Sequence, residues 1–149
     1  MLRVGCIVLS IWAGLNLLPS VFILVSTGLL DRDAPAVAQV LDAEEIEALS
    51  EHERVSINSV AVYANGLNAA FCATALWVIW CGLNQRVLWA FWCLVTGFVL
   101  AFGAGTLADA VVGMQHPQIN LVSAVILFCG CGLSAVDLFW LGRRSVPAV

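Results

Sequence analysis

Four long apolar stretches constrain this chain more than any other feature of its sequence. An α-helix needs about 20 apolar residues to cross the roughly 30 Å hydrocarbon core of a bilayer. Hydrophobic residues make up 62% of the 149 positions and charged residues 11%, so the chain carries more apolar surface than one soluble core buries. The sequence predicts an all-α, polytopic membrane protein in a single domain, residues 1–149. Its four transmembrane helices are expected at about 4–25, 57–83, 87–113 and 119–141.

The connections between these stretches predict how the helices run. Residues 84–86 and 114–118 are short links, and each can only join antiparallel neighbours. We therefore expect an antiparallel four-helix bundle. The first stretch follows Arg3, as in a signal peptide, but it exceeds the roughly 7 to 15 residues of a signal-peptide core. We interpret it as a retained span.

The arginines predict the orientation, because the chain contains no lysine. One predicted side carries four arginines and the other carries two, surrounded by acidic residues. The positive-inside rule then places both termini in the cytoplasm and the acidic loop 26–56 outside. The composition, rich in Ala, Val and Arg, suggests a bacterial source, hence the inner (plasma) membrane. The four arginines are Arg3, Arg86, Arg143 and Arg144, and the two are Arg32 and Arg54.

The outer loop contains signals for short amphipathic helices. Asp33-Ala34-Pro35 suits a helix start, and Asp42 with Glu45 forms a variant of the capping box. The acidic run that follows either attracts a cation or a partner, or is simply a solvated face. Its sign excludes a nucleic-acid role, which needs a positive stripe. The apolar side of these helices would consist of Val37, Leu41, Ile46 and Leu49.

Small and polar residues recur at helical spacing in every span. In lipid, helices associate through close packing at small residues and through interhelical hydrogen bonds. We therefore expect each stripe to face the interior of the bundle, with Asp109 on the packing seam of the third helix. The stripes are Ala13, Asn16 and Ser20; Asn58, Ala61, Asn65, Asn68 and Cys72; Gly97, Ala101, Gly105, Asp109 and Gly113; and Ser123, Gly130, Ser134 and Asp137.

These stripes predict a polar pocket open to the outer side. An ionisable side chain costs on the order of 3 kcal/mol at the centre of a span and is a functional candidate by default. Asp109 lies about one turn from the outer end, however, so structural hydrogen bonding is the competing interpretation. The asparagines likewise either bind a ligand or join helices. The predicted lining is Asn16, Asn65, Asn68, Thr106 and Asp109.

Other groups suggest little chemistry. Asp137 lies near Arg143 and Arg144 and is expected to pair with them or to extend to the surface. All six cysteines fall within the apolar stretches without a C-x-x-C motif, so we interpret them as small apolar filler. His52 with neighbouring acids is the one weak alternative for a surface metal site. We predict no metal and no cofactor.

Two segments of the chain resemble a known family. Residues 57–79, INSVAVYANGLNAAFCATALWVI, and 97–118, GFVLAFGAGTLADAVVGMQHPQ, resemble small bacterial four-helix membrane proteins of unknown function in the DoxX-like neighbourhood. Tyr63 followed by small residues matches one family element, and Asp109 before the Pro117 turn approximates another. Thr106 stands near a position where relatives often carry Arg, and Ser123 where they often carry an acid. The resemblance implies the fold more than an activity.

Three functions are compatible with this sequence. The absence of a phosphate loop, a G-x-S-x-G motif or a zinc-protease motif favours a non-catalytic accessory or structural subunit of a larger membrane complex. Its partners would be membrane lipids and other membrane subunits or further copies of itself. The alternative is an intramembrane isomerase, cyclase or hydrolase acting on a lipophilic substrate, with Asp109 as general acid or base and Tyr63 orienting the substrate. A channel along the asparagine stripe is the third hypothesis.

Overall fold

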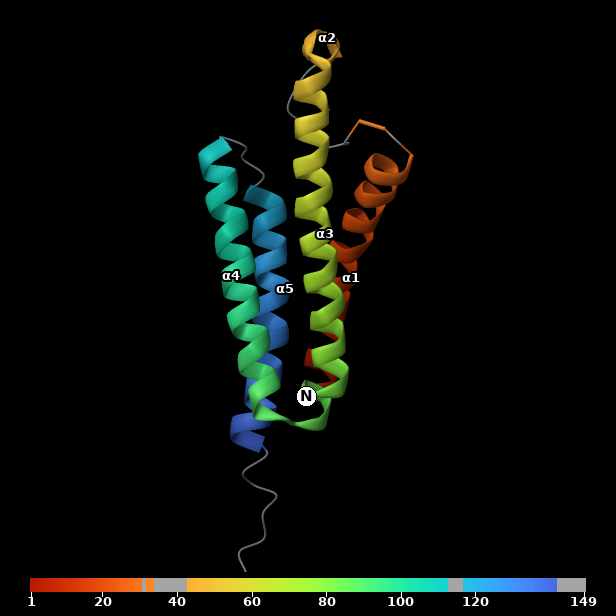
Figure 1. Ribbon diagram of the computed structural model, residues 1–149. Helices are drawn as coiled ribbons and strands as arrows, with labels where there is room; N and C mark the ends of the chain where they lie inside the picture. Colours follow the sequence, from red (N-terminus) through yellow and green to blue (C-terminus); the bar gives the residue numbers. More distant parts are fainter. Residues whose placement is uncertain (31, 34–42, 113–116, 142–149) are drawn as a thin grey trace, which may run out of the picture. The chain divides into compact units, whose positions relative to one another are not determined.

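The computed structural model describes residues 1–30, 32–33, 43–112 and 117–141, and these residues form helices without strands (Figure 1). This confirms the all-α fold with four long helices. The α-helices are α1 (Leu2–Ile23), α2 (Ala43–Ala48), α3 (Glu51–Cys81), α4 (Leu88–Val112) and α5 (Pro117–Ala135). Shorter segments follow three of them: the π-helices η1 (Leu24–Leu29) and η4 (Val136–Leu141) and the 3-10 helix η3 (Leu83–Gln85).

Four helical segments are long and apolar enough to cross a membrane: Leu2–Leu29, Glu51–Gln85, Leu88–Leu107 and Leu121–Leu141. In the most apolar window of each, only 22% to 33% of the residues are buried inside the protein. The remaining apolar surface needs an apolar surrounding, which a bilayer provides. These features define a multi-pass membrane protein. The first segment continues through η1 to Leu29, beyond the predicted end at residue 25.

Helix α3 begins at Glu51 rather than near residue 57, because a capping box starts it. The backbone N–H of Ser50 donates to Glu53 Oε2 at 2.9 Å, and the backbone N–H of Glu53 donates to Ser50 Oγ at 3.3 Å. These reciprocal bonds satisfy donors that a helix start otherwise leaves unpaired. The Ser-x-x-Glu spacing was present in the sequence as a usable signal.

The acidic loop contains one short helix among its described residues. Helix α2 begins at Ala43, directly after the start predicted at Asp42. The start predicted at Asp33-Ala34-Pro35, together with Val37 and Leu41, lies outside the described residues. Arg54 of α3 fixes this region, because its Nη2 donates to the carbonyl of Ile46 at 3.1 Å and its Nε lies 3.7 Å from Asp33 Oδ1.

The link between α3 and α4 is a tight turn. The N–H of Arg86 donates to the carbonyl of Leu83 at 2.9 Å, and Arg86 itself adopts a left-handed conformation with φ of 63°. Position 82 requires glycine because the backbone there lies very close to α4. A Cβ on Gly82 would lie 2.6 Å from Cβ of Ala90. The predicted short antiparallel connection is confirmed.

The helices form two compact units, which are described separately: unit 1 is Met1–Ala13 with Thr74–Val149, and unit 2 is Gly14–Ala73. Within unit 1, α1 and α5 approach closely at glycines. A Cβ on Gly130 would lie 2.6 Å from Cδ2 of Leu9, and a Cβ on Gly5 would lie 2.9 Å from the carbonyl oxygen of Gly130. Ser134 is fully buried beside them. The predicted stripe on the fourth span therefore packs as expected.

Aromatic side chains also pack within unit 1. The rings of Trp12 and Phe98 meet edge to face with centroids 4.9 Å apart, and those of Phe91 and Phe139 are 5.6 Å apart. Edge-to-face geometry is favourable beyond the apolar area it buries. Figure 1 shows α4 and α5 running side by side in opposite directions.

The small-residue stripe of α4 differs from the prediction. Of its described members, Gly97 is half-buried, whereas Ala101 and Gly105 are exposed, as is the neighbouring Ala104. In the described part of unit 1 no heavy atom lies within 4 Å of an ideal Cβ on Gly105. The physical reason is that α4 turns its bulky side chains inward: Phe91 and Phe98 are buried. Burying large apolar side chains outweighs burying glycine and alanine. The part of the stripe at Ala101 and Gly105 is therefore an open face and not an internal seam.

Candidate functional site

Four predicted site residues, Asn16, Tyr63, Asn65 and Asn68, belong to unit 2, where a hydrogen bond joins α1 to α3. The side-chain amide of Asn68 donates to Ser20 Oγ at 2.8 Å, and the Ser20 hydroxyl donates to the carbonyl of Asn16 at 3.0 Å. Ser20 is 2% exposed and Asn68 is half-buried, so this bond is part-buried. The structure thus joins Asn68 to Ser20 by an interhelical amide bond of the kind expected in lipid, and Asn16 takes part through its backbone carbonyl.

Asn65 and Tyr63 have other surroundings. The amide of Asn65 donates to the carbonyl of Ala61 in its own helix at 2.8 Å. Tyr63 is 70% exposed and borders an open pocket of unit 2 together with Thr27 and Asn58. The Asn65 side chain therefore bonds within its own helix, while the Tyr63 side chain is exposed at the surface.

Thr106 and Asp109 belong to unit 1. The Thr106 hydroxyl lies 3.0 Å from the carbonyls of both Phe102 and Gly103, and it donates within its own helix. Asp109 is part of α4, but its side chain lies outside the described set. Because the two units are described separately, an outer pocket shared by these residues and the asparagines stays a prediction, as does Asp109 catalysis.

The charged cluster around Asp137 is a site that the sequence interpretation underestimated. The Asp137 side chain is 8% exposed and lies at the start of η4. The backbone N–H of Leu2 donates to its Oδ2 at 2.8 Å, and the terminal ammonium of Met1 lies 3.1 Å from the same oxygen. Arg86 Nη2 lies 2.9 Å from Oδ1. One buried carboxylate therefore connects α1, the η3 turn and η4.

The predicted partners of Asp137, Arg143 and Arg144, lie outside the described residues. The observed partner, Arg86, was available to sequence reasoning. Antiparallel spans place the link 84–86 and the end of the fourth span on the same membrane side. In the sequence, Arg86 was interpreted only as an orientation signal and not as an ion-pair partner of Asp137.

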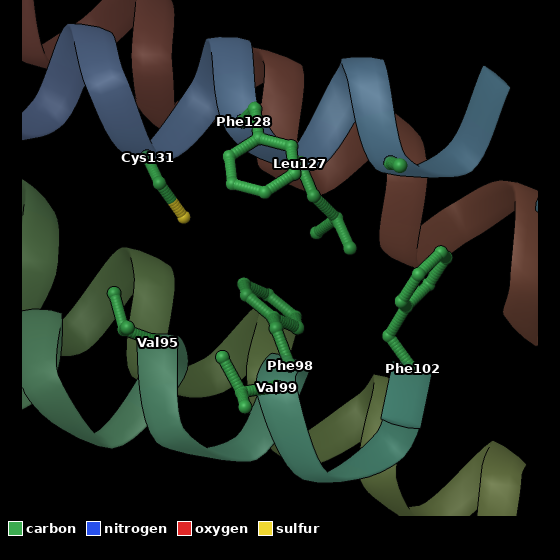
Figure 2. Close-up of a pocket in the computed structure, with 8 residues that line it drawn as sticks. Val95, Phe98, Val99, Phe102, Leu127, Phe128 and Cys131 are labelled. Carbon is green, nitrogen blue, oxygen red and sulfur yellow. The ribbon is translucent and has the colours of Figure 1, made fainter. Parts of the chain in front are cut away.

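An apolar cavity of about 130 Å³ lies between α4 and α5 in unit 1 (Figure 2). Figure 2 shows Phe98 and Phe102 of α4 facing Leu127, Phe128 and Cys131 of α5 across this space. Val99 and Phe128 are 67% and 79% exposed, so the cavity opens at the helix surface. Its lining offers contacts to hydrocarbon and, apart from one thiol, nothing that donates or accepts a hydrogen bond.

The thiols and histidines build no metal site in the described part of the chain. No group of three or more His, Cys, Asp or Glu side chains able to hold a metal ion occurs there. All six cysteines are free thiols, and Cys6 and Cys72 are fully buried. His52 is exposed in the first turn of α3.

Comparison of the chain with protein-family models, curated proteins and solved structures finds no match, and the DoxX-like resemblance therefore stays a prediction.

Proposed function

We propose that this protein is a non-catalytic accessory or structural subunit of a larger membrane assembly, and that the open small-residue face of α4 is where a partner helix packs. We define this α4 face by Ala101, Ala104 and Gly105. Its exposure is the single observation that carries the proposal. Small residues let helix backbones approach closely, which drives helix association in lipid.

The exposure of the α4 face differs from that of the corresponding stripes on the other long helices. The described stripe residues of α1, α3 and α5 are buried or half-buried, and each stripe has a member at 0% exposure: Ala13, Cys72 and Ser134. Among the described residues, only the α4 stripe has exposed members, Ala101 and Gly105. This exposed part of the α4 stripe supports an external partner.

The hydrogen bonding of the predicted site residues also supports a structural role. Asn65, Asn68 and Thr106 each donate to a protein acceptor. Side chains committed to internal bonds are less available to bind and orient a substrate, since breaking each bond costs about 1 kcal/mol. The enzymatic alternative thus receives no specific support.

We infer further that the protein resides in a bacterial inner membrane with both termini in the cytoplasm. The support is the distribution of arginines: Arg86 lies in the α3–α4 turn, and Arg32 and Arg54 are outnumbered by acids at the opposite ends of these spans.

Blue native electrophoresis in mild detergent tests the proposed function. We expect wild-type protein in membranes of its source to migrate well above a 15.9 kDa protomer. Gly105→Leu adds bulk to the α4 face and should shift the band to the protomer. Gly132→Leu is the matched control, because a Cβ on Gly132 also meets open space among the described residues, but on α5. Equal migration of both variants with wild type, or a wild-type protomer, would overturn the proposal.

A further inference from the structure

An open pocket of about 450 Å³ lies in unit 2, where the end of the first span meets the start of α3. The residues come from two segments only, η1 and the first turns of α3. Because both segments are ends of candidate membrane spans, the pocket sits where apolar helix meets the polar boundary of the bilayer. Its lining is Thr27, Gly28, Val55, Asn58, Ser59, Val62 and Tyr63.

Gly28 keeps this pocket open on the η1 side. An ideal Cβ there would lie 3.7 Å from Cγ2 of Val62, at ordinary contact distance, so a larger side chain would occupy the space. The opposite rim consists of Val55 and Tyr63, which are 58% and 70% exposed. A ligand can therefore enter from the side of the helix pair.

Thr27 is the residue that suggests a ligand in this pocket. Its side chain lines the pocket, the residue is 7% exposed, and its Oγ1 is buried without a hydrogen-bond partner among the described residues. Neighbouring hydroxyls are satisfied: Ser26 donates to the carbonyl of Ile23 at 3.2 Å, and Ser59 donates to that of Val55 at 2.7 Å.

A buried hydroxyl without a partner costs about 1 to 3 kcal/mol, so it calls for an explanation such as a bound group. Thr27 lies in a π-helical segment, a geometry frequently found at functional sites. A threonine in a helix has two accessible side-chain rotamers. Because Thr27 Oγ1 is buried in the structure, donation to a ligand in the pocket requires this second rotamer.

The lining chemistry defines the ligand. The polar residues are Thr27, Asn58, Ser59 and Tyr63, all uncharged, and two valines supply an apolar wall. Nearby charge does not favour an anion, because Glu51 and Glu53 stand in the first turn of α3 and Arg54 is paired with Asp33, against one further base, Arg32, just after η1. The site suits a neutral group that accepts hydrogen bonds and carries an apolar chain. In a bilayer, the ester carbonyls of a glycerolipid have this chemistry at this boundary.

We propose that this η1–α3 pocket binds the uncharged glycerol-ester region of a neutral glycerolipid, with the Thr27 hydroxyl donating to an ester carbonyl. Val55 and Val62 contact the start of the acyl chain. The asparagine and serine supply further polar contacts around the glycerol.

Binding of dioleoylglycerol to the full-length protein in dodecyl maltoside micelles, which contain no ester, tests this site. Thr27→Val removes only the hydroxyl and should weaken binding about five-fold, the effect of one lost hydrogen bond. Thr27→Ser retains the donor and should stay within about two-fold of wild type. Thr96→Val is the matched control, because Thr96 is exposed on α4.

A second variant fills the space instead of removing the donor. Gly28→Leu should weaken dioleoylglycerol binding about ten-fold or more, since a leucine side chain would occupy the position of the acyl chain. The proposal is overturned if Thr27→Val and Gly28→Leu both bind like Thr96→Val. It is also overturned if phosphatidylglycerol, an anionic lipid, binds as tightly as dioleoylglycerol and depends equally on Thr27. The size of the assembly in blue native gels should not change in Thr27→Val, so this test is separate from that of the α4 face.

Discussion

The two units of the molecule bury polar groups in opposite ways. In unit 1 the Asp137 carboxylate, at the start of π-helix η4, is surrounded by the N–H of Leu2, the terminal ammonium and Arg86. In unit 2 the Thr27 hydroxyl, in π-helix η1, has no hydrogen-bond partner among the described residues. Oδ1 of Asp137 makes an ion pair with Arg86 but no hydrogen bond among the described residues, so the carboxylate is held by charge and by the bonds to its Oδ2. A buried polar group with such partners stabilises a fold, whereas one without any partner is a cost that a ligand can offset.

The same contrast holds for packing. Unit 1 contains helix contacts so close that a single Cβ on Gly130 would collide with Leu9. Unit 2 leaves an open pocket of about 450 Å³ between its helices. We therefore expect substitutions in unit 1 to act on stability and those in the η1–α3 pocket to act on binding. The following predictions test this division.

Gly130→Leu should have the largest effect on stability. The added side chain collides with Leu9 of α1, and overpacking of this kind costs about 3 kcal/mol. Gly132→Leu, two residues along the same helix, meets open space among the described residues and should stay within about 0.5 kcal/mol of wild type. Equilibrium unfolding in mixed micelles of mild detergent and sodium dodecyl sulfate measures both. Equal stability of the two variants would contradict the close α1–α5 contact.

Asp137→Asn should lower the free energy of unfolding by about 2 kcal/mol, because hydrogen bonds and ion pairs to a buried charge are lost. Arg86→Gln should cost less, below about 1 kcal/mol, since the Arg86 side chain is 55% exposed and water replaces its interaction. Glu47→Gln, an exposed acid of α2, serves as the control. The same unfolding assay applies, and an Asp137→Asn variant as stable as this control would be evidence against the cluster.

The Asn68–Ser20 bond should contribute less again. A double-mutant cycle of Asn68→Ala and Ser20→Ala isolates its coupling, which we expect to be about 0.6 kcal/mol, typical of interhelical hydrogen bonds in membranes. The pair Asn65→Ala and Ser20→Ala should show none, because Asn65 bonds within its own helix. Coupling in the second pair and not in the first would reverse the assignment.

Thr27→Val should have an effect on stability of opposite sign, with no loss. In the absence of dioleoylglycerol it should leave the free energy of unfolding unchanged or raise it by up to about 1 kcal/mol, because valine has the shape of threonine without the unpaired hydroxyl. Unfolding measured with and without the lipid checks this. A loss of stability without lipid would mean that the hydroxyl already has a partner.

The spans could be predicted from the sequence because hydropathy over about 20 residues is a local property. The start of α3 was missed although Ser50 and Glu53 carry the capping signal, since the apolar stretch begins later than the helix. The orientation of α4 was missed because its small residues and its large apolar residues both recur at helical spacing, so the spacing alone does not tell which set faces the interior. Only the packing of Phe91 and Phe98 decides which one is buried.

Of the candidate site, the interhelical asparagine Asn68 could be predicted from the sequence, whereas its partner Ser20 could not. The bond from Asn68 to Ser20 joins residues 48 positions apart, and that from Leu2 to Asp137 joins residues 135 apart. Such pairs depend on how helices come together. Thr27 was assigned to the loop 26–56, so its burial could not be anticipated without knowing that helical structure continues to Leu29.

The most direct test of the account is the number and direction of membrane crossings. Alkaline phosphatase, active only outside, and green fluorescent protein, fluorescent only inside, can be fused after residues 48, 85, 115 and 144. Four crossings with cytoplasmic termini predict phosphatase activity at residues 48 and 115 and fluorescence at residues 85 and 144. Two successive fusion points on the same side would contradict the four-span structure on which both the α4 face and the η1–α3 pocket depend.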